Sequence, residues 1–172
     1  VIHERAKSEK GDHDGEDASA GAAVAIDPSS GEVLALASYP TFNLSDYLEN
    51  YKLYSADEKR PLYNRATLGT YTPGSTFKPG VAAAALDAGV ITVNTTVYDG
   101  GYYTLGTYSP RCWYYLRYNR GHGNQNVVQA IQNSCNVFFY DVGNRLGIEK
   151  MNEYIKKFGL GEPTGIEIGE SK

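Results

Sequence analysis

The pattern of apolar and polar positions near the start of the chain predicts a β-hairpin. Residues 21–26 and 32–37 are rich in valine, isoleucine and alanine, and the sequence Asp-Pro-Ser-Ser-Gly at 27–31 separates them. These turn residues favour the tight reversal that joins two antiparallel strands. We expect both strands to be buried on at least one face.

Further along the chain, apolar residues recur at helical spacing. We expect an apolar helix over residues 75–88 with a stop at Gly89, the residue type that most often ends a helix. Asn126 is followed three residues later by a glutamine, the pattern of a capping box, and helical periodicity then continues to residue 142. A last amphipathic helix is expected over residues 149–158, and residues 92–125 indicate loops with short strands.

Residues 133–136 read Asn-Ser-Cys-Asn and interrupt the second of these helical stretches. Short polar side chains compete for the backbone hydrogen bonds of a helix. In an unbroken helix Ser134 and Asn136 would point about 200° apart, because the helix has 3.6 residues per turn. If both residues serve one cleft, the helix must break, and we predict that break near Ser134.

The sequence Thr-Pro-Gly-Ser-Thr-Phe-Lys-Pro at 72–79 carries the candidate nucleophile. Residues three apart share a helix face, so Ser75 and Lys78 can meet at the start of the apolar helix. A serine needs an adjacent base, and a lysine becomes one when burial lowers its pKa from about 10.4 towards 7 to 8. Such a shift of roughly three units corresponds to about 4 kcal/mol. The alternative is a serine at a helix start beside a solvated lysine.

Composition narrows the class of protein. The chain has 172 residues, 41% of them hydrophobic, which suits one globular domain with a real core. Its net charge of −4 gives no electrostatic footprint for nucleic acid. No apolar run reaches the length of a membrane span. Residues 1–20 are polar and charged and indicate a linker or flexible terminus, which leaves residues 21–172 for the domain.

The cysteines and histidines indicate neither a disulfide framework nor a metal site. Cys112 and Cys135 allow one optional bridge, and two unpaired, half-buried thiols are the simpler interpretation. His3, His13 and His122 are scattered, and none lies in a recognisable metal-binding spacing. We therefore expect no metal and no cofactor. A histidine-based triad has no support either, since the chain lacks a Gly-x-Ser-x-Gly sequence.

The chain presents, in this order, a hairpin, a Ser-x-x-Lys helix and the sequence Ser-Cys-Asn. This order resembles the transpeptidase domain of class B high-molecular-weight penicillin-binding proteins. The stretches that carry the resemblance are AAVAIDPSSGEVLALASY (22–39), PLYNRATLGTYTPGSTFKP (61–79), GHGNQNVVQAIQNSCNVFFYDVG (121–143) and FGLGEPTGIEIG (158–169). The resemblance implies an α/β (α+β) fold of the penicillin-binding protein and serine β-lactamase type. In that fold an antiparallel sheet accompanies a helical lobe, and this chain would lack the C-terminal part.

The resemblance also implies an activity and a role for each motif residue. Ser75 would attack the carbonyl of the penultimate D-alanine of a peptidoglycan stem peptide, and Lys78 would take its proton. Ser134 would relay a proton to the leaving group, Asn136 would hold the substrate amide, and the Ser75 N–H would supply half of an oxyanion hole. β-Lactams would acylate the same serine. The expected setting is the extracytoplasmic face of the bacterial membrane, within a cell-wall synthesis complex.

The chain departs from the family pattern in one respect. The third motif, Lys-Thr-Gly or Lys-Ser-Gly, is missing, and Pro163-Thr164-Gly165 lacks the lysine and comes too early. Three explanations are open: the chain is part of a longer protein, a second chain supplies the C-terminal remainder of the domain, or the protein is inactive. A hairpin without neighbouring strands exposes unpaired edges, which favours a missing complement.

Three further hypotheses remain open from the sequence. A serine β-lactamase shares the Ser-x-x-Lys motif but needs a base that activates water. A non-catalytic β-lactam sensor or scaffold domain would use the same fold for binding alone. Finally, a Cys112–Cys135 disulfide, which an extracytoplasmic location permits, would distort the second motif and make activity sensitive to redox state.

Overall fold

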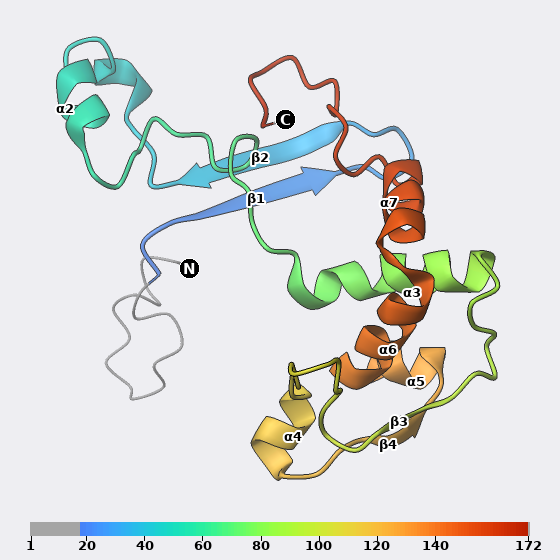
Figure 1. Ribbon diagram of the computed structural model, residues 1–172. Helices are drawn as coiled ribbons and strands as arrows, with labels where there is room; N and C mark the ends of the chain where they lie inside the picture. Colours follow the sequence, from blue (N-terminus) through green and yellow to red (C-terminus); the bar gives the residue numbers. More distant parts are fainter. Residues whose placement is uncertain (1–17, 172) are drawn as a thin grey trace. The chain divides into compact units, whose positions relative to one another are not determined.

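The computed structural model describes residues 18–171, and the chain divides into two compact units (Figure 1). One unit contains the described residues up to Tyr71 together with those from Gly165 onwards. The other unit runs from Thr72 to Thr164 and contains most of the helices. Of the polar terminus expected at residues 1–20, residues 1–17 lie outside the described residues.

The first unit contains the predicted hairpin. Strands β1 (Gly21–Ile26) and β2 (Val33–Tyr39) pair antiparallel, and a register shift follows Ala25. The turn between them closes through backbone hydrogen bonds from the Asp27 N–H to the Glu32 carbonyl and from the Gly31 N–H to the Asp27 carbonyl. Gly31 has a φ of +79°, which a residue without a Cβ adopts at little cost. The prediction of the hairpin is confirmed.

The expected burial of the hairpin is wrong. Most residues of both strands are exposed; Val24 is 47% and Leu34 68% exposed. Among residues 18–171 this sheet consists of two strands, and no further strand extends it. A two-stranded sheet of this kind is stable only with additional partners.

The remainder of the first unit is irregular. A short 3₁₀ helix, η1 (Leu44–Asp46), begins at Asn43, whose side chain accepts a hydrogen bond from the Ser45 N–H. Helix α2 (Tyr51–Ala56) follows, and Tyr54 donates a hydrogen bond to Asp46 over 2.7 Å. This stretch therefore contains two short helical pieces and not one continuous helix.

The second unit is built around three helices. Helix η2 (Gly74–Phe77), a 3₁₀ turn, leads directly into α3 (Lys78–Asp87), which ends before Gly89 with a φ of +68°. Helix α5 (Val127–Gln132) precedes α6 (Asn136–Leu146), and both pack against α3. The last helix, α7 (Ile148–Lys157), also contacts α3 and α6, and Gly159 follows it with a φ of +74°.

The core of the second unit lies where α3, α5 and α6 meet. Phe138 and Val142 on α6 are fully buried, and Ala85 on α3 and Ala130 on α5 are equally inaccessible. Small alanines on two helices let the large aromatic side chain of the third approach closely, as close packing of an interior requires. This core fixes the starts of α3 and α6, where the motif residues lie.

The segment expected to hold loops and short strands also contains a helix. Strands β3 (Val97–Asp99) and β4 (Gly123–Gln125) form a second antiparallel pair, and α4 (Trp113–Tyr118) lies between them in sequence. The sequence did not predict α4, because its apolar and aromatic residues do not recur at helical spacing within a stretch rich in tyrosine and glycine. Among the described residues, no helix combines the length and the apolar character that crossing a bilayer requires.

Replacing Phe138 by alanine tests the importance of the core. Because Phe138 is completely buried, Phe138→Ala should lower the free energy of unfolding by about 3–5 kcal/mol. Urea unfolding of the protein that carries this chain measures the change. Val128→Ala on α5, whose side chain is 64% exposed, is the control and should change stability by less than about 1 kcal/mol. Equal effects of the two variants would contradict the assignment of the core.

Candidate active site

The helix break that the sequence predicts near Ser134 is confirmed. Helix α5 begins at Asn126 with a complete capping box, in which Asn126 and Gln129 each accept from the other's backbone N–H. Helix α5 ends at Gln132, and Ser134 adopts a left-handed φ of +49°. Helix α6 then starts after Cys135, whose sulfur accepts a hydrogen bond from the Phe138 N–H. The break lets Ser134 and Asn136 serve the same site.

The Ser-x-x-Lys motif lies at the junction of the 3₁₀ turn and the α-helix. Ser75 belongs to η2 and Lys78 is the first residue of α3. A 3₁₀ turn has three residues per turn, so side chains three apart lie on the same side. Ser75 is exposed, whereas Lys78 is partly buried. The serine therefore faces solvent while the lysine points towards the protein.

The lysine is held by the second motif. Lys78 Nζ donates hydrogen bonds to the Ser134 carbonyl over 2.7 Å, to Ser134 Oγ over 3.0 Å and to Asn136 Oδ1 over 2.7 Å. Ser134 Oγ donates in turn to Ser75 Oγ over 3.0 Å. The four predicted site residues thus lie in one connected network. In this network Ser134 links Ser75 to Lys78, whereas the sequence suggested that the serine and the lysine would meet directly.

Burial lowers the pKa of Lys78 below its ordinary value of 10.5, because the partly buried ammonium loses hydration. The Lys78 side chain also lies over the ring of Phe139, with Nζ 5.7 Å from the ring centroid. The three hydrogen-bond acceptors of Nζ are uncharged, and the nearby sulfurs of Cys112 and Cys135 oppose the effect of lost hydration without outweighing it. At a given pH, the neutral form of Lys78 is therefore more populated than that of a solvated lysine.

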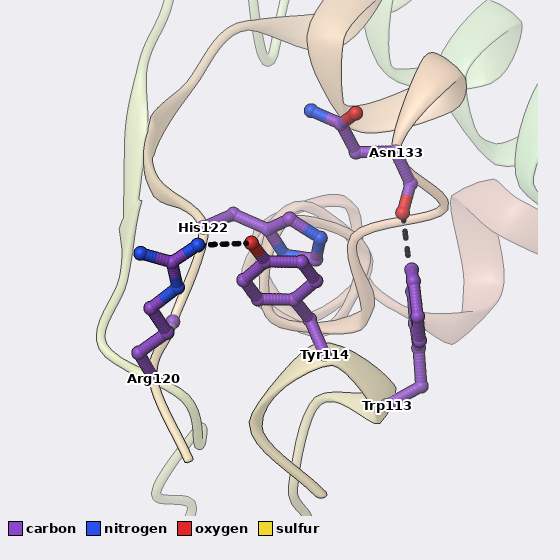
Figure 2. Close-up of a pocket in the computed structure, with 6 residues that line it drawn as sticks. Trp113, Tyr114, Arg120, His122 and Asn133 are labelled. Atoms are coloured by element: carbon purple, nitrogen blue, oxygen red, sulfur yellow. Dashed lines mark hydrogen bonds between the residues drawn. The ribbon is translucent and has the colours of Figure 1, made fainter. Parts of the chain in front are cut away.

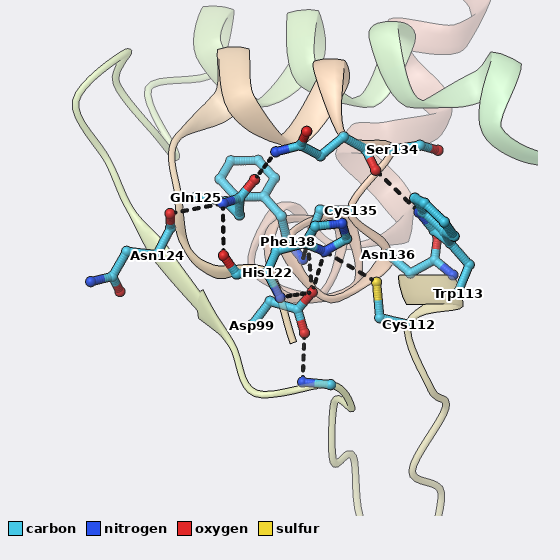
Figure 3. Close-up of polar contacts among 12 residues, drawn as sticks. Asp99, Cys112, Trp113, His122, Asn124, Gln125, Ser134, Cys135, Asn136 and Phe138 are labelled. Carbon is cyan, nitrogen blue, oxygen red and sulfur yellow. Dashed lines mark hydrogen bonds and ion pairs between the residues drawn. The ribbon is translucent and has the colours of Figure 1, made fainter. Parts of the chain in front are cut away.

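A second cluster of reactive side chains lies directly beneath the second motif (Figure 3). It consists of Asp99, Cys112, His122 and Cys135, whose ligand atoms all lie within 4.8 Å of one another. His122 Nδ1 is 2.6 Å from Asp99 Oδ2, and Cys112 Sγ is 3.6 Å from His122 Nδ1. Cys135 Sγ donates to Asp99 Oδ2 over 3.3 Å. We refer to these four residues as the Asp-Cys-His-Cys cluster.

Three separate parts of the second unit supply this cluster. Asp99 ends β3, His122 immediately precedes β4, and the pairing of these strands places the two side chains together. Cys112 precedes the first residue of α4 and Cys135 precedes the first residue of α6. Gly121 passes so close to the Asp99 backbone that a Cβ there would collide with it, which explains the need for glycine.

Burial and hydrogen bonding together set the protonation of the cluster. It raises the pKa of the Cys135 thiol to about 12, so the free thiol keeps its proton at neutral pH. Burial also acts to raise the pKa of Asp99. Hydrogen bonds from His122, the Gly101 N–H and the two thiols outweigh it and hold the pKa of this carboxyl below its usual range.

The structure corrects two expectations for these residues. Cys112 and Cys135 are free thiols, so the proposed disulfide is not formed, and both are fully buried rather than half-buried. Each sulfur is engaged by the Asp99–His122 pair. No local spacing in the sequence indicated this cluster, because tertiary structure brings together four residues that could hold a metal ion. Carboxylate, imidazole and two thiolates are a donor set that suits Zn²⁺, with ligand atoms about 3–4 Å apart in a tetrahedron.

A pocket of about 380 Å³ opens beside the cluster (Figure 2). Trp113, Tyr114, Arg120 and His122 line it together with Gly121 and Asn133. Tyr114 stacks on His122 with ring centroids 4.3 Å apart, and the Trp113 indole donates to the Asn133 carbonyl over 3.1 Å. The pocket therefore connects one member of the cluster, His122, with the segment that leads to Ser134.

Comparison with known proteins agrees with the order of the motifs. The penicillin binding protein transpeptidase domain family matches residues 21–172. Peptidoglycan D,D-transpeptidase MrdA of Haemophilus influenzae is 41% identical over 155 residues, which are 87% of this chain and 24% of that protein. The chain thus spans about a quarter of the length of such curated relatives.

Solved structures give the same result. Pseudomonas aeruginosa PBP2 in complex with WCK 5153 superposes with a TM-score of 0.79 at 35% identity, over 99% of this chain and 38% of that chain. The imipenem acyl-enzyme of penicillin-binding protein A from Mycobacterium tuberculosis gives a TM-score of 0.74 at 30% identity, over 87% of this chain and 37% of that chain. The expected α/β (α+β) fold class is confirmed, and the chain belongs to the transpeptidase domain family of the class B penicillin-binding proteins.

Proposed function

We propose that this chain carries the nucleophile and the proton-transfer groups of a peptidoglycan D,D-transpeptidase. The observation that carries the proposal is the hydrogen-bonded series from Lys78 through Ser134 to Ser75, formed by the first two motifs of the family. The names of the curated relatives support the activity. The substrate class would be stem peptides that end in D-Ala-D-Ala, and β-lactams would react at the same serine.

Ser134 is the proton relay in this proposal. When Lys78 is neutral, its two N–H bonds satisfy the Ser134 carbonyl and Asn136 Oδ1, and its lone pair faces Ser134 Oγ. Ser134 then donates to the lysine and accepts from Ser75. As Ser75 Oγ attacks the substrate carbonyl, its proton passes to Ser134 and the Ser134 proton passes to Lys78. The reverse transfer protonates the leaving D-alanine.

Asn136 has two tasks in the proposed mechanism. Its side-chain oxygen fixes Lys78 at 2.7 Å, and its NH₂ group is suited to hydrogen-bond a substrate carbonyl. The Ser75 N–H, at the turn before α3, would be one donor of an oxyanion hole, a device whose loss costs about 10²–10³ in rate. An amine of a second stem peptide would then resolve the acyl-enzyme into a cross-link.

The proposal requires partners beyond this chain. The outer edges of β1 and β2 can pair with further strands, and their exposed apolar side chains offer a face for packing; the C-terminal remainder of the domain would supply both, together with the third motif. Whether the remainder follows in the same polypeptide or comes from a second chain, the complete domain would work at the extracytoplasmic face of the bacterial membrane. There it would act within a cell-wall synthesis complex.

Acylation by a fluorescent penicillin tests the assignment of the nucleophile. Ser75→Ala in the full-length protein should abolish covalent labelling, because no oxygen remains to form the ester. Ser55→Ala, which removes an exposed hydroxyl on α2, is the matched control and should label like the unaltered protein. Labelling that survives Ser75→Ala, detected on a denaturing gel, would overturn the assignment and favour a domain that binds without this nucleophile.

The lifetime of the labelled protein separates two enzyme classes. A transpeptidase should keep the penicilloyl ester for hours, whereas a serine β-lactamase would hydrolyse it within a second. Mass spectrometry of the adduct over time gives the rate directly. Rapid loss of the adduct would replace the proposed transpeptidase by a lactamase while leaving Ser75 as the nucleophile.

The pH dependence of acylation tests the role of Lys78. A general base must be neutral, so the acylation rate should rise with pH, and burial should place the midpoint of the rise below 10.5. Lys78→Arg, which stays cationic at every accessible pH, should slow acylation by about 10²–10⁴-fold and remove this rise. A profile in Lys78→Arg that matches that of the unaltered protein would exclude Lys78 as the base.

A further inference from the structure

The segment that surrounds the second motif is cationic, although the chain as a whole is acidic. Residues 100–140 contain three arginines, Arg111, Arg117 and Arg120, and neither aspartate nor glutamate, whereas the whole chain has a net charge of −4. A local excess of positive charge attracts ligands that carry negative charge. A ligand of this segment is therefore expected to be anionic.

Arg120 has hydrogen-bonding capacity that the protein does not use. Its Nη2 donates to Tyr114 Oη over 3.1 Å, and its guanidinium carbon lies 5.7 Å from the centroid of the Tyr114 ring. Within residues 18–171, no carboxylate forms an ion pair with Arg120. A guanidinium has five N–H groups in a planar fork that matches a carboxylate. Arg120 can therefore bind a carboxylate at the pocket that it lines.

The other walls of this pocket are held in place without a ligand (Figure 2). Trp113 and Arg120 stand on opposite sides of Tyr114, and the Trp113 indole donates to the Asn133 carbonyl. The Asn133 side chain is held in turn, because its Nδ2 donates to Gln125 Oε1 over 2.7 Å. Trp113 is 38% exposed, so it offers an apolar face beside the cation. Walls that are already ordered lower the entropy cost of binding.

We propose that this pocket is the subsite for the acceptor stem peptide, the peptide whose amine resolves the acyl-enzyme, and that Arg120 binds a carboxylate of that peptide. The inference rests on the proposed function, because it identifies where the second substrate of the same site is held. Trp113 packs against the peptide chain, and Arg120 selects peptides that carry a carboxylate.

The chemistry of the second step brings the acceptor to this side of the site. When its amine attacks the ester carbonyl, a C–N bond forms and the C–O bond to Ser75 breaks. The amine gives up one proton to the relay of Ser134 and Lys78, and Ser75 Oγ regains one, so the step balances without a further reactant. The amine must therefore approach Ser134. Asn133 directly precedes Ser134 and lines the pocket, so the remainder of the peptide has a binding surface next to its reacting end.

Fluorine NMR of Trp113 measures occupation of the pocket in the full-length protein. The protein contains 5-fluorotryptophan, Ser75 is acylated with benzylpenicillin, and the Trp113 resonance is assigned by comparison with Trp113→Phe. The probe is N-acetyl-L-Ala-γ-D-Glu-L-Lys-D-Ala, which has a free amine and free carboxylates. In its matched partner the carboxylates are converted to amides.

The two peptides should bind with different affinities. We expect the first peptide to shift the Trp113 resonance along a saturating curve. The amidated peptide should bind about five- to tenfold more weakly, because it lacks the charge-assisted hydrogen bonds to a partly solvated guanidinium. Equal binding of the two peptides, or no shift with either, would overturn the proposal.

Arg120→Gln separates recognition of the carboxylate from general electrostatic attraction. This variant should weaken binding of the carboxylate peptide by about five- to tenfold and change binding of the amidated peptide by less than about twofold. Arg117→Gln is the matched control, since it removes an exposed cation of the same segment that does not line the pocket. It should change neither affinity by more than about twofold. Equal weakening by the two variants would contradict a specific role for Arg120.

Two further results locate any failure. Binding to the free protein that disappears once Ser75 is acylated would assign the pocket to the donor peptide and overturn the acceptor subsite. A full-length protein that forms no penicilloyl ester would contradict the proposed function itself. A protein that forms the ester but does not bind the carboxylate peptide would contradict only the subsite.

Discussion

The hydrogen bonds of Lys78 are the interaction on which the proposed active site depends. Nζ reaches across from the start of α3 to the break between α5 and α6, where it meets a carbonyl, a hydroxyl and an amide oxygen within 3.0 Å. Three uncharged acceptors hold the amine in place without fixing its charge, since none of them is a carboxylate. The lysine can therefore be buried and positioned while its pKa falls.

The core of the second unit makes this contact possible. Phe138 packs among the small residues of α3 and α5, which brings the first residues of α3 and α6 together. The left-handed Ser134 then turns its side chain and its carbonyl towards the lysine. Under this loop, the sulfur of Cys135 caps α6 and contacts Asp99, so the second motif is supported from below by the Asp-Cys-His-Cys cluster.

Local sequence signals predicted the elements of both units. The turn at 27–31 indicated the hairpin of the first unit. In the second unit, Asn126 and Gln129 indicated the start of α5, and the polar run around Ser134 indicated the break that the site needs. The sequence could not predict the role of Ser134 as the link between Ser75 and Lys78. That link requires the distance between two helices, which no local pattern contains.

The Asp-Cys-His-Cys cluster was missed for a related reason. Asp99 ends a strand, Cys112 and Cys135 each directly precede a helix, and no pair of the three has a metal-binding spacing. What the three residues share is complete burial at the boundary of an element, and this becomes visible only in the folded structure. The exposure of the hairpin was also unpredictable, because apolar-rich strands show that a face can be covered and not whether the covering layer is present.

The titration of the Lys78 side chain tests the central claim most directly. Selective isotope labelling of lysine, assigned by comparison with Lys78→Arg, allows NMR to follow the ε-carbon of Lys78 as the pH is raised. The account predicts a midpoint below 10.5 in the native protein and a return to the ordinary value when the protein is unfolded. A native midpoint at or above 10.5 would mean that the ammonium is stabilised by its surroundings, and Lys78 could not then be the base that activates Ser75.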